Sequence, residues 1–468
     1  MRAPQTQPDH RPVAALRGPL VHCLGDPDRD GPAAVQAIDD GMIVLHGGHI
    51  RAVGHYDALA AMIPAGARVD AWPTSLIVPG LVDAHVHFPQ LDVIASHGAQ
   101  LLDWLTRYVF PAEARFADPA FAAAAAETFL DALIRHGTTT ALVFCTVHPT
   151  SAEALFAAAH RRNVRLIAGK VLMDRHAPAE LLDTAEQGIA DSDALIRRWH
   201  GRGRLGYALT PRFAPTSSPR QLGLTGRLLA EHADVLLHTH LSENRDELAW
   251  VAELFPDARD YLDVYDRFGL VTDRSVFAHG VHLDRSGLAR LAGAEAALAH
   301  CPSSNLFLGS GLFDLAAAEH AGVRVGLGSD VGAGTSLSML ATMGEAYKVA
   351  QVTGHVLSPA KALYLATQAP AQALRLDDRI GNFQAGKEAD ILVLDPRASP
   401  LLRQRLTPDA GIADKLFALS ILGDDRAVAQ VYLQGVPQHA AVAPAAVPEA
   451  RYAAFALPFP FRCARPGS

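Results

Sequence analysis

The alternation of hydrophobic and polar residues divides the chain into a central part and two β-rich ends. Residues 41–54 contain two short apolar runs separated by Gly47 and Gly48, which is the pattern of a β-hairpin with a tight turn. The β pattern returns after residue 384, with predicted strands at 390–395 and 428–433 that are separated by loops. We expect the two ends, residues 1–76 and 385–468, to form one small composite β-sandwich domain and a C-terminal tail.

In the central part, residues 77–384, short apolar strands alternate with alanine-rich helical segments. The pattern predicts strands at 139–145, 165–171, 205–209, 234–240, 275–279, 296–300 and 323–328, and helices at 119–136, 151–161, 179–200 and 219–232. Repeated strand–helix units over about 300 residues are typical of a parallel (β/α)8 barrel of the TIM type. An open doubly wound sheet fits less well, because no glycine-rich phosphate loop follows a strand.

Composition narrows the classes of function. Of the 468 residues 49% are hydrophobic and 19% are charged, which indicates a folded protein with a large core. The net charge of −8 without basic blocks argues against a nucleic acid or a membrane surface as partner, and no apolar run reaches the length of a membrane span. The four cysteines are scattered without a C-x-x-C pair, which argues against a cysteine-rich zinc site and favours the cytoplasm.

Residues that can bind a metal or transfer protons stand at the ends of four predicted strands. His85 and His87 follow the apolar run 75–78 and share one face, because side chains alternate along a strand. A lone H-x-H motif is a weak signal in a chain with 22 histidines. The other strand ends hold His238, His240, Glu243, His279 and Asp330. Since catalytic groups lie at the carboxyl ends of barrel strands, we expect these side chains to meet.

These residue types fit a catalytic metal site. Catalytic zinc takes three or four nitrogen and oxygen ligands and lowers the pKa of a bound water from 15.7 to about 7. His85, His87 and a third histidine can supply nitrogen, and Asp330 can supply oxygen. His238 and His240 share a strand face, so their spacing does not identify the third ligand. Cys145 and His148, near the end of another strand, are expected to be structural.

The stretches that carry these residues resemble the amidohydrolase superfamily. The shared motifs are P-G-L-V-D-A-H-V-H at 79–87, T-H-L-S-E at 239–243, A-H-G at 278–280 and G-S-D at 328–330. Within the superfamily the chain is similar to the guanine deaminase family. That similarity lies in F-P-Q at 88–90, L-L-D-W-L at 101–105, Y-V-F-P-A-E at 108–113, G-T-T-T-A at 137–141, K-V-L-M-D-R at 170–175, T-P-R-F-A-P-T at 210–216 and G-S-D-V-G-A-G at 328–334.

The resemblance implies a role for each matching residue. It implies that one zinc ion per chain is held by His85, His87, His240 and Asp330, and it thereby favours His240 over His238. It further implies that Asp330 removes the water proton, Glu243 carries a proton to the ring, His279 lies beside the metal, and Gln90, Arg212 and Phe213 read the purine edge. The implied reaction is hydrolysis of guanine to xanthine and ammonia by a metal-activated hydroxide that attacks C2. The resemblance also implies a homodimer.

Several alternatives stay open. Arg212 can only donate hydrogen bonds and Gln90 can donate and accept, which suits a base with a carbonyl group, but Arg212 could instead form a structural ion pair. The substrate could be another amino-substituted heterocycle, such as 8-oxoguanine, a triazine or cytosine, and iron or manganese could replace zinc. A non-catalytic relative is disfavoured because every ligand position is filled. The deaminase class with a P-C-x-x-C zinc motif is excluded by the absence of C-x-x-C.

Overall fold

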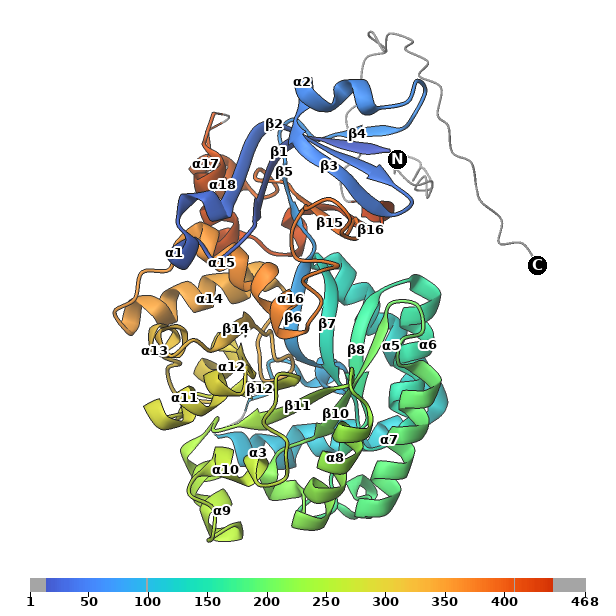
Figure 1. Ribbon diagram of the computed structural model, residues 1–468, viewed down its shortest axis with the longest axis vertical. Coiled ribbons are helices and arrows are strands. Elements are labelled where there is room, and N and C mark those ends of the chain that lie inside the picture. Colours follow the sequence, from blue (N-terminus) through green and yellow to red (C-terminus); the bar gives the residue numbers. More distant parts are fainter. Residues whose placement is uncertain (1–13, 98–99, 408, 441–468) are drawn as a thin grey trace, which may run out of the picture.

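The computed structural model describes residues 14–97, 100–407 and 409–440. A parallel barrel forms the main body, and a mixed β-sheet covers one end of it (Figure 1). The tail predicted beyond residue 440 lies outside the described residues. No helix in the described part of the chain combines the length and the apolar character needed to cross a membrane.

Eight parallel strands form the nearly closed barrel. In spatial order they are β6 (Leu81–His87), β7 (Thr138–Phe144), β8 (Arg165–Gly169), β10 (Leu205–Pro211), β11 (Leu236–Leu241), β12 (Ser275–His279), β13 (Ala297–His300) and β14 (Arg324–Leu327), and β9 (Val171–Leu172) also pairs with β10. The segment after β14 returns to β6, where the Asp330 amide donates to the His85 carbonyl at 2.8 Å and the His87 amide donates to the Val331 carbonyl at 2.9 Å. The predicted (β/α)8 barrel is therefore confirmed.

Helices surround the barrel. They are α5 (Pro119–Arg135), α6 (Pro149–Arg162), α7 (Ala185–Trp199), α8 (Pro219–Glu231), α9 (Arg245–Leu254), α10 (Tyr261–Asp266), α11 (Arg285–Gly293), α12 (Pro302–Phe307), α13 (Leu315–His320), α14 (Met339–Val352), α15 (Pro359–Leu365) and α16 (Gln368–Ala373). The helix predicted from residue 179 begins instead at Ala185. Thr184 explains this start, because its side chain accepts a hydrogen bond from the Gln187 amide and caps the helix.

The small sheet joins the two ends of the chain. Its strand order is β17 (Val436–Ala440), β16 (Val428–Leu433), β15 (Ile391–Leu394), β5 (Leu76–Pro79), β1 (Ala15–Cys23), β2 (Val35–His46) and β3 (His49–His55), and β4 (Val69–Ala71) pairs with β1. The helices α1 (Pro27–Asp30) and α2 (Tyr56–Leu59) accompany it. The hairpin turn is confirmed: Gly47 and Gly48 both have positive φ, 58° and 81°, as a type I′ turn requires. Antiparallel pairing of β5 with β15 makes the domain composite.

The prediction of loops between β15 and β16 is wrong. Two helices occupy this segment, α17 (Pro400–Arg405) and α18 (Ile412–Leu422). In α18, Leu416 and Leu419 are buried against the barrel helices α14 and α15. Apolar residues lie on most sides of this helix, so its sequence lacks the amphipathic period by which a surface helix is recognised.

Buried charges connect the small sheet to the barrel. Glu388 Oε2 accepts hydrogen bonds from Arg165 Nε at 2.9 Å and from Arg204 Nε at 3.0 Å. Arg204 also pairs with Asp390. Arg165 begins β8 and Arg204 precedes β10, whereas both carboxylates precede β15. Burial raises the pKa of Glu388, but the bonds to Arg165 and the charge of Arg204 outweigh burial and leave that pKa below its usual value.

We expect Glu388→Gln to lower the free energy of unfolding by about 3–5 kcal/mol, because removal of one member of a buried ion pair leaves its partners uncompensated. Urea unfolding at neutral pH measures this change. The matched control is Glu127→Gln, since Glu127 pairs with Arg161 at 2.6 Å with 44% of its side chain exposed. We expect that control to change the free energy by less than about 1 kcal/mol. Equal losses in the two variants would contradict a structural role for the buried pair.

Candidate metal centre and active site

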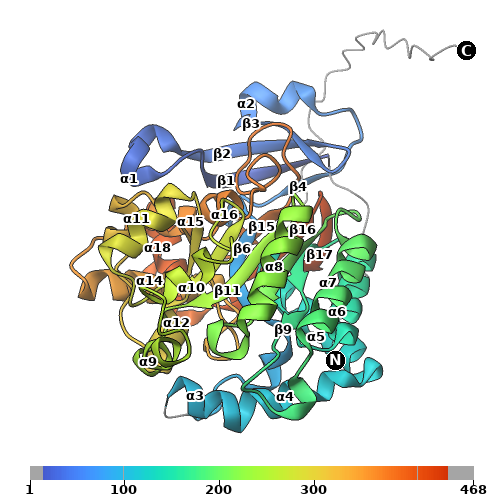
Figure 2. The same cartoon turned by 60° about the horizontal axis from the view of Figure 1, so that its bottom comes forward.

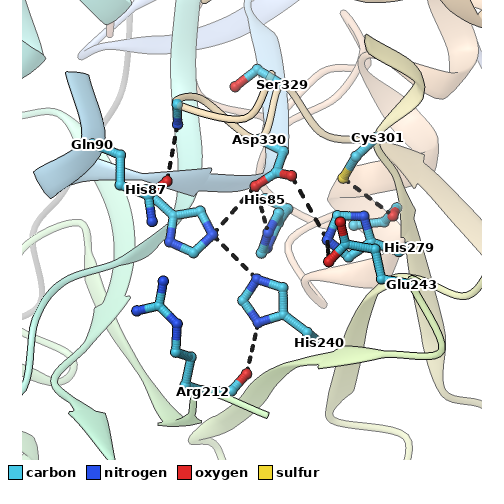
Figure 3. Close-up of polar contacts among 12 residues, drawn as sticks. His85, His87, Gln90, Arg212, His240, Glu243, His279, Cys301, Ser329 and Asp330 are labelled. Carbon is cyan, nitrogen blue, oxygen red and sulfur yellow. Dashed lines mark hydrogen bonds and ion pairs between the residues drawn. The ribbon is translucent and has the colours of Figure 1, made fainter. Parts of the chain in front are cut away.

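Four buried side chains converge at the carboxyl end of the barrel (Figure 3). Asp330 Oδ1 lies 3.1 Å from His85 Nε2 and 3.3 Å from His87 Nε2. His240 Nε2 lies 3.3 Å from His87 Nε2. One donor atom from each of the four residues lies within 4.8 Å of the others. The three imidazoles of His85, His87 and His240 and the carboxylate of Asp330 form a donor set that could bind a divalent metal ion. These four residues are called the metal group below.

Hydrogen bonds on the outer side of the rings orient these histidines. His240 Nδ1 lies 2.7 Å from the Arg212 carbonyl, which can only accept, so Nδ1 carries the proton and the lone pair of Nε2 faces the centre. His85 Nδ1 lies 2.7 Å from His238 Nε2. His238 therefore stands behind His85, and His240 occupies the place in the group of four that spacing alone had left open.

Burial keeps the imidazoles neutral, as metal ligands must be. It lowers the pKa of His87 to about 3 and lowers the pKa of His240 well below its usual value. Burial alone would raise the pKa of Asp330, but the adjacent His85 and His87 outweigh it and hold that pKa well below the usual range. The carboxyl group is therefore ionised and available as an oxygen ligand.

A possible acid–base pair lies beside the metal group. His279 Nε2 is 3.4 Å from Glu243 Oε2 and 3.7 Å from Asp330 Oδ2. His279 Nδ1 is 2.9 Å from Asn305 Oδ1, an acceptor that leaves Nε2 facing the site. Burial, and then the charge of Asp330, raise the pKa of Glu243 well above its usual value. The raised pKa favours the protonated form of Glu243, and the Glu243 backbone amide donates to Glu247 Oε2 at 2.8 Å.

The backbone turns sharply where these strands end. Ser242, His279 and Asp330 have φ values of 50°, 73° and 50°, in the left-handed region that non-glycine residues seldom adopt. At Gly328, an added Cβ would lie 2.9 Å from the Cβ of His85, so the close approach of β14 to β6 requires glycine. Strained backbone of this kind clusters at functional sites.

A cavity opens onto the metal group. Its lining is His87, Gln90, Leu101, Trp104, Leu105, Arg212, Phe213, His240, Glu243, Asp330 and Ala333. The apolar side comes from α3 (Leu101–Trp104) and the π-helical turn Leu105–Val109, which continues into α4 (Phe110–Ala114). These elements lie at the end of the barrel away from the small sheet (Figure 2). The cavity is therefore polar on the side of the metal group and apolar on the side of α3 and the π-helical turn.

The three residues predicted to read a purine edge all line this cavity, and two of them share a partner that the sequence did not reveal. Glu113 Oε1 accepts from Gln90 Nε2 at 3.1 Å, and both of its oxygens accept from Arg212 Nη1 at 2.9 Å. Arg212 thus forms the ion pair considered as its alternative role and still faces the cavity. The one feature of the sequence that could have pointed to this partner is that Glu113 is a single acidic residue in the otherwise apolar stretch 109–114. Asn305, the partner of His279, had no comparable signal.

Residues 76–437 match the amidohydrolase family, and the chain belongs to that family. Its relatives include guanine deaminase of Escherichia coli strain K12, which is 49% identical over 90% of this chain and 97% of that protein. The structure of E. coli guanine deaminase superposes with a TM-score of 0.90 at 47% identity, covering 92% of this chain and all of that one. Guanine deaminase from C. acetobutylicum with bound guanine gives 0.82 at 27% identity, covering 90% and 99%. Within the family, the chain thus stands with the guanine deaminases.

Proposed function

We propose that the protein is a guanine deaminase of purine catabolism, which hydrolyses guanine to xanthine and ammonia. The observation that carries this proposal is a single cavity lined both by three members of the metal group, His87, His240 and Asp330, and by the donor pair Gln90 and Arg212. In Figure 3, Gln90 and Arg212 lie on one side of the metal group, and Glu243 and His279 lie on the other. A base placed between them can be recognised at one edge and can react at the opposite edge.

We propose that His85, His87, His240 and Asp330 hold one zinc ion per chain. The nitrogen and oxygen donor set supports zinc. So does an adenosine deaminase structure from Xanthomonas campestris with bound zinc, which has a TM-score of 0.79 at 26% identity. When bound, zinc lowers the pKa of water, so that hydroxide is available near neutral pH.

The chain's own groups would then carry the protons. Asp330, held ionised, accepts the proton of the attacking water, and Glu243, held protonated, donates to ring N3 as the C2–oxygen bond forms. His279 directs Nε2 at the same space and can hydrogen-bond the oxygen that adds to C2. Asp330 then returns its proton to the 2-amino group and Glu243 takes the proton of the added C2 hydroxyl, so that the C2–nitrogen bond breaks, ammonia leaves and xanthine remains.

The choice of substrate would depend on recognition of the guanine edge that carries the O6 carbonyl. Arg212 offers only donors and therefore needs an acceptor such as the O6 carbonyl of guanine. Adenine has an amino group at that position, so a buried donor would remain unpaired, which is unfavourable. Phe213 adds apolar contact in the same part of the cavity. A heterocycle with the same carbonyl, such as 8-oxoguanine, is the main competing substrate.

We expect Arg212→Ala to lower kcat/KM for guanine by about 10–150-fold, since hydrogen bonds to charged groups contribute about 1.5–3 kcal/mol. Metal content should stay at the wild-type value. Steady-state kinetics with metal analysis measures both quantities. The control is Arg161→Ala, because Arg161 is 62% exposed and pairs with a surface glutamate. Unchanged kinetics in Arg212→Ala would overturn the assignment.

The deciding experiment follows ammonia and xanthine together from the purified, zinc-loaded protein with guanine. Equimolar release of both products is expected. No release with one metal ion bound per chain would reject guanine, and 8-oxoguanine, cytosine and triazines would be tested next.

We also propose that the protein is a cytoplasmic homodimer. Three cysteines of the described residues, Cys23, Cys145 and Cys301, are buried free thiols, which suits a reducing compartment. Light scattering on the purified protein would test the dimer.

A further inference from the structure

We propose that Glu113 is the positioning residue that determines specificity for a neutral base with a carbonyl group. This inference rests on the proposed function. Glu113 lies on α4, is fully buried and does not line the cavity. It acts only through Gln90 and Arg212, to which it is hydrogen bonded.

Glu113 sets which atoms Gln90 presents. An ionised carboxylate only accepts hydrogen bonds, so the amide nitrogen of Gln90 must face Glu113. The Gly332 amide only donates, and it lies 3.3 Å from Gln90 Oε1. A flipped amide would set oxygen against oxygen and N–H against N–H. One N–H and one lone pair of Gln90 are therefore left in fixed positions for the base.

The approach of Gly332 depends on its lack of a side chain. A Cβ at residue 332 would lie 2.6 Å from the Gln90 carbonyl oxygen and 3.1 Å from the Gln90 Cβ. The amide of Gln90 is therefore held on one side by Gly332 and on the other by Glu113. This double restraint keeps the edge of the cavity preorganised before the ligand enters.

Glu113 also sets the charge that the base meets. Both oxygens of Glu113 contact the same Arg212 nitrogen, so the two residues form a neutral pair. The other titratable groups that line the cavity are His87, His240, Glu243 and Asp330. Of these groups, His240 contacts only the backbone carbonyl of Arg212, and His87 and Glu243 interact with the guanidinium through charge without a hydrogen bond to it. Guanine is neutral, whereas xanthine, which has a second carbonyl at C2 and one more ring N–H at N3, more readily becomes an anion. A neutralised Arg212 accepts guanine without favouring the xanthine anion, which assists product release.

The test is Glu113→Gln, with metal content and thermal midpoint recorded for every variant. We expect KM for guanine to rise at least tenfold, with a smaller change in kcat. We also expect xanthine to inhibit more tightly as the pH rises through its first ionisation, because the uncompensated Arg212 attracts the anion. In the wild type, inhibition should not tighten over that range. A purely structural role would not produce this pH profile.

Glu113→Asp is the second variant, because it keeps the negative charge but is too short to hold both partners. We expect a raised KM for guanine, and we expect xanthine inhibition to depend on pH as it does in the wild type. Glu127→Gln, at the exposed pair with Arg161, is the control and should match the wild type. The proposal is overturned if Glu113→Gln keeps the wild-type KM and profile, or if Glu113→Asp keeps the wild-type KM. If Glu113→Gln does not fold, Glu113→Asp decides.

Failure of the proposed function would be visible separately, because the wild type would then release no ammonia from guanine. Calorimetric binding of guanine and xanthine to the same variants would still measure the effect of Glu113. An unchanged ratio of the two affinities in Glu113→Gln would overturn the inference by that route also.

Discussion

Glu243→Gln is expected to lower kcat for guanine by about 10²–10⁴-fold while metal stays bound, because a positioned acid–base group contributes that factor. Glutamine has nearly the same shape but cannot transfer a proton, so the cavity is preserved and only proton transfer to the ring is lost. Single-turnover kinetics at saturating guanine, together with metal analysis, separates this loss from weaker binding.

The pH dependence gives a second view of Glu243. Burial raises its pKa well above the usual value, which favours the protonated form and moves the loss of the proton to higher pH. The wild-type rate should therefore fall as the pH rises through that pKa, and Glu243→Gln should not show that fall. Glu253→Gln, on the exposed side of α9, is the matched control and should keep both rate and profile. Near-normal turnover of Glu243→Gln with metal bound would refute the assignment.

Removal of the metal is expected to abolish turnover. Without the ion, the pKa of the attacking water returns to about 15.7, and almost no hydroxide exists at neutral pH. Dialysis against a chelator should remove both metal and activity, and added zinc should restore both. His240→Ala should not regain full metal content, because one of the four ligands is missing. The readouts are the number of metal ions per chain and the rate of ammonia release.

A surface histidine supplies the control for this experiment. His55 is exposed at the end of β3, in the small sheet and outside the barrel, and His55→Ala should keep wild-type metal content. Full activity of the metal-free protein, or wild-type metal affinity in His240→Ala, would contradict the proposed centre.

Local sequence was sufficient to predict the barrel and to place His85, His87 and Asp330 at the ends of its strands. Strand and helix periods depend on near neighbours, and in a parallel barrel every strand ends at the same face. His85, His87 and Asp330 follow short apolar runs that predicted strands, and the structure brings them within contact distance, although the run before His85 forms β5 of the small sheet and His85 itself lies on β6. The hairpin at Gly47 was equally accessible, because a turn with two positive φ angles requires residues such as glycine.

The roles of the other site residues depend on contacts between segments that are distant in the chain. His238 and His240 share a strand face, and only the position of β6 places one behind His85 and the other in the metal group. Glu113 is separated by about a hundred residues from Arg212, so no local pattern could reveal their pairing. The helix α18 packs Leu416 and Leu419 against the barrel helices α14 and α15, which lie far from it in the chain, while Ile421 stays exposed. In each case the neighbours that give a side chain its role come from elements far apart in the chain, and folding alone brings them together.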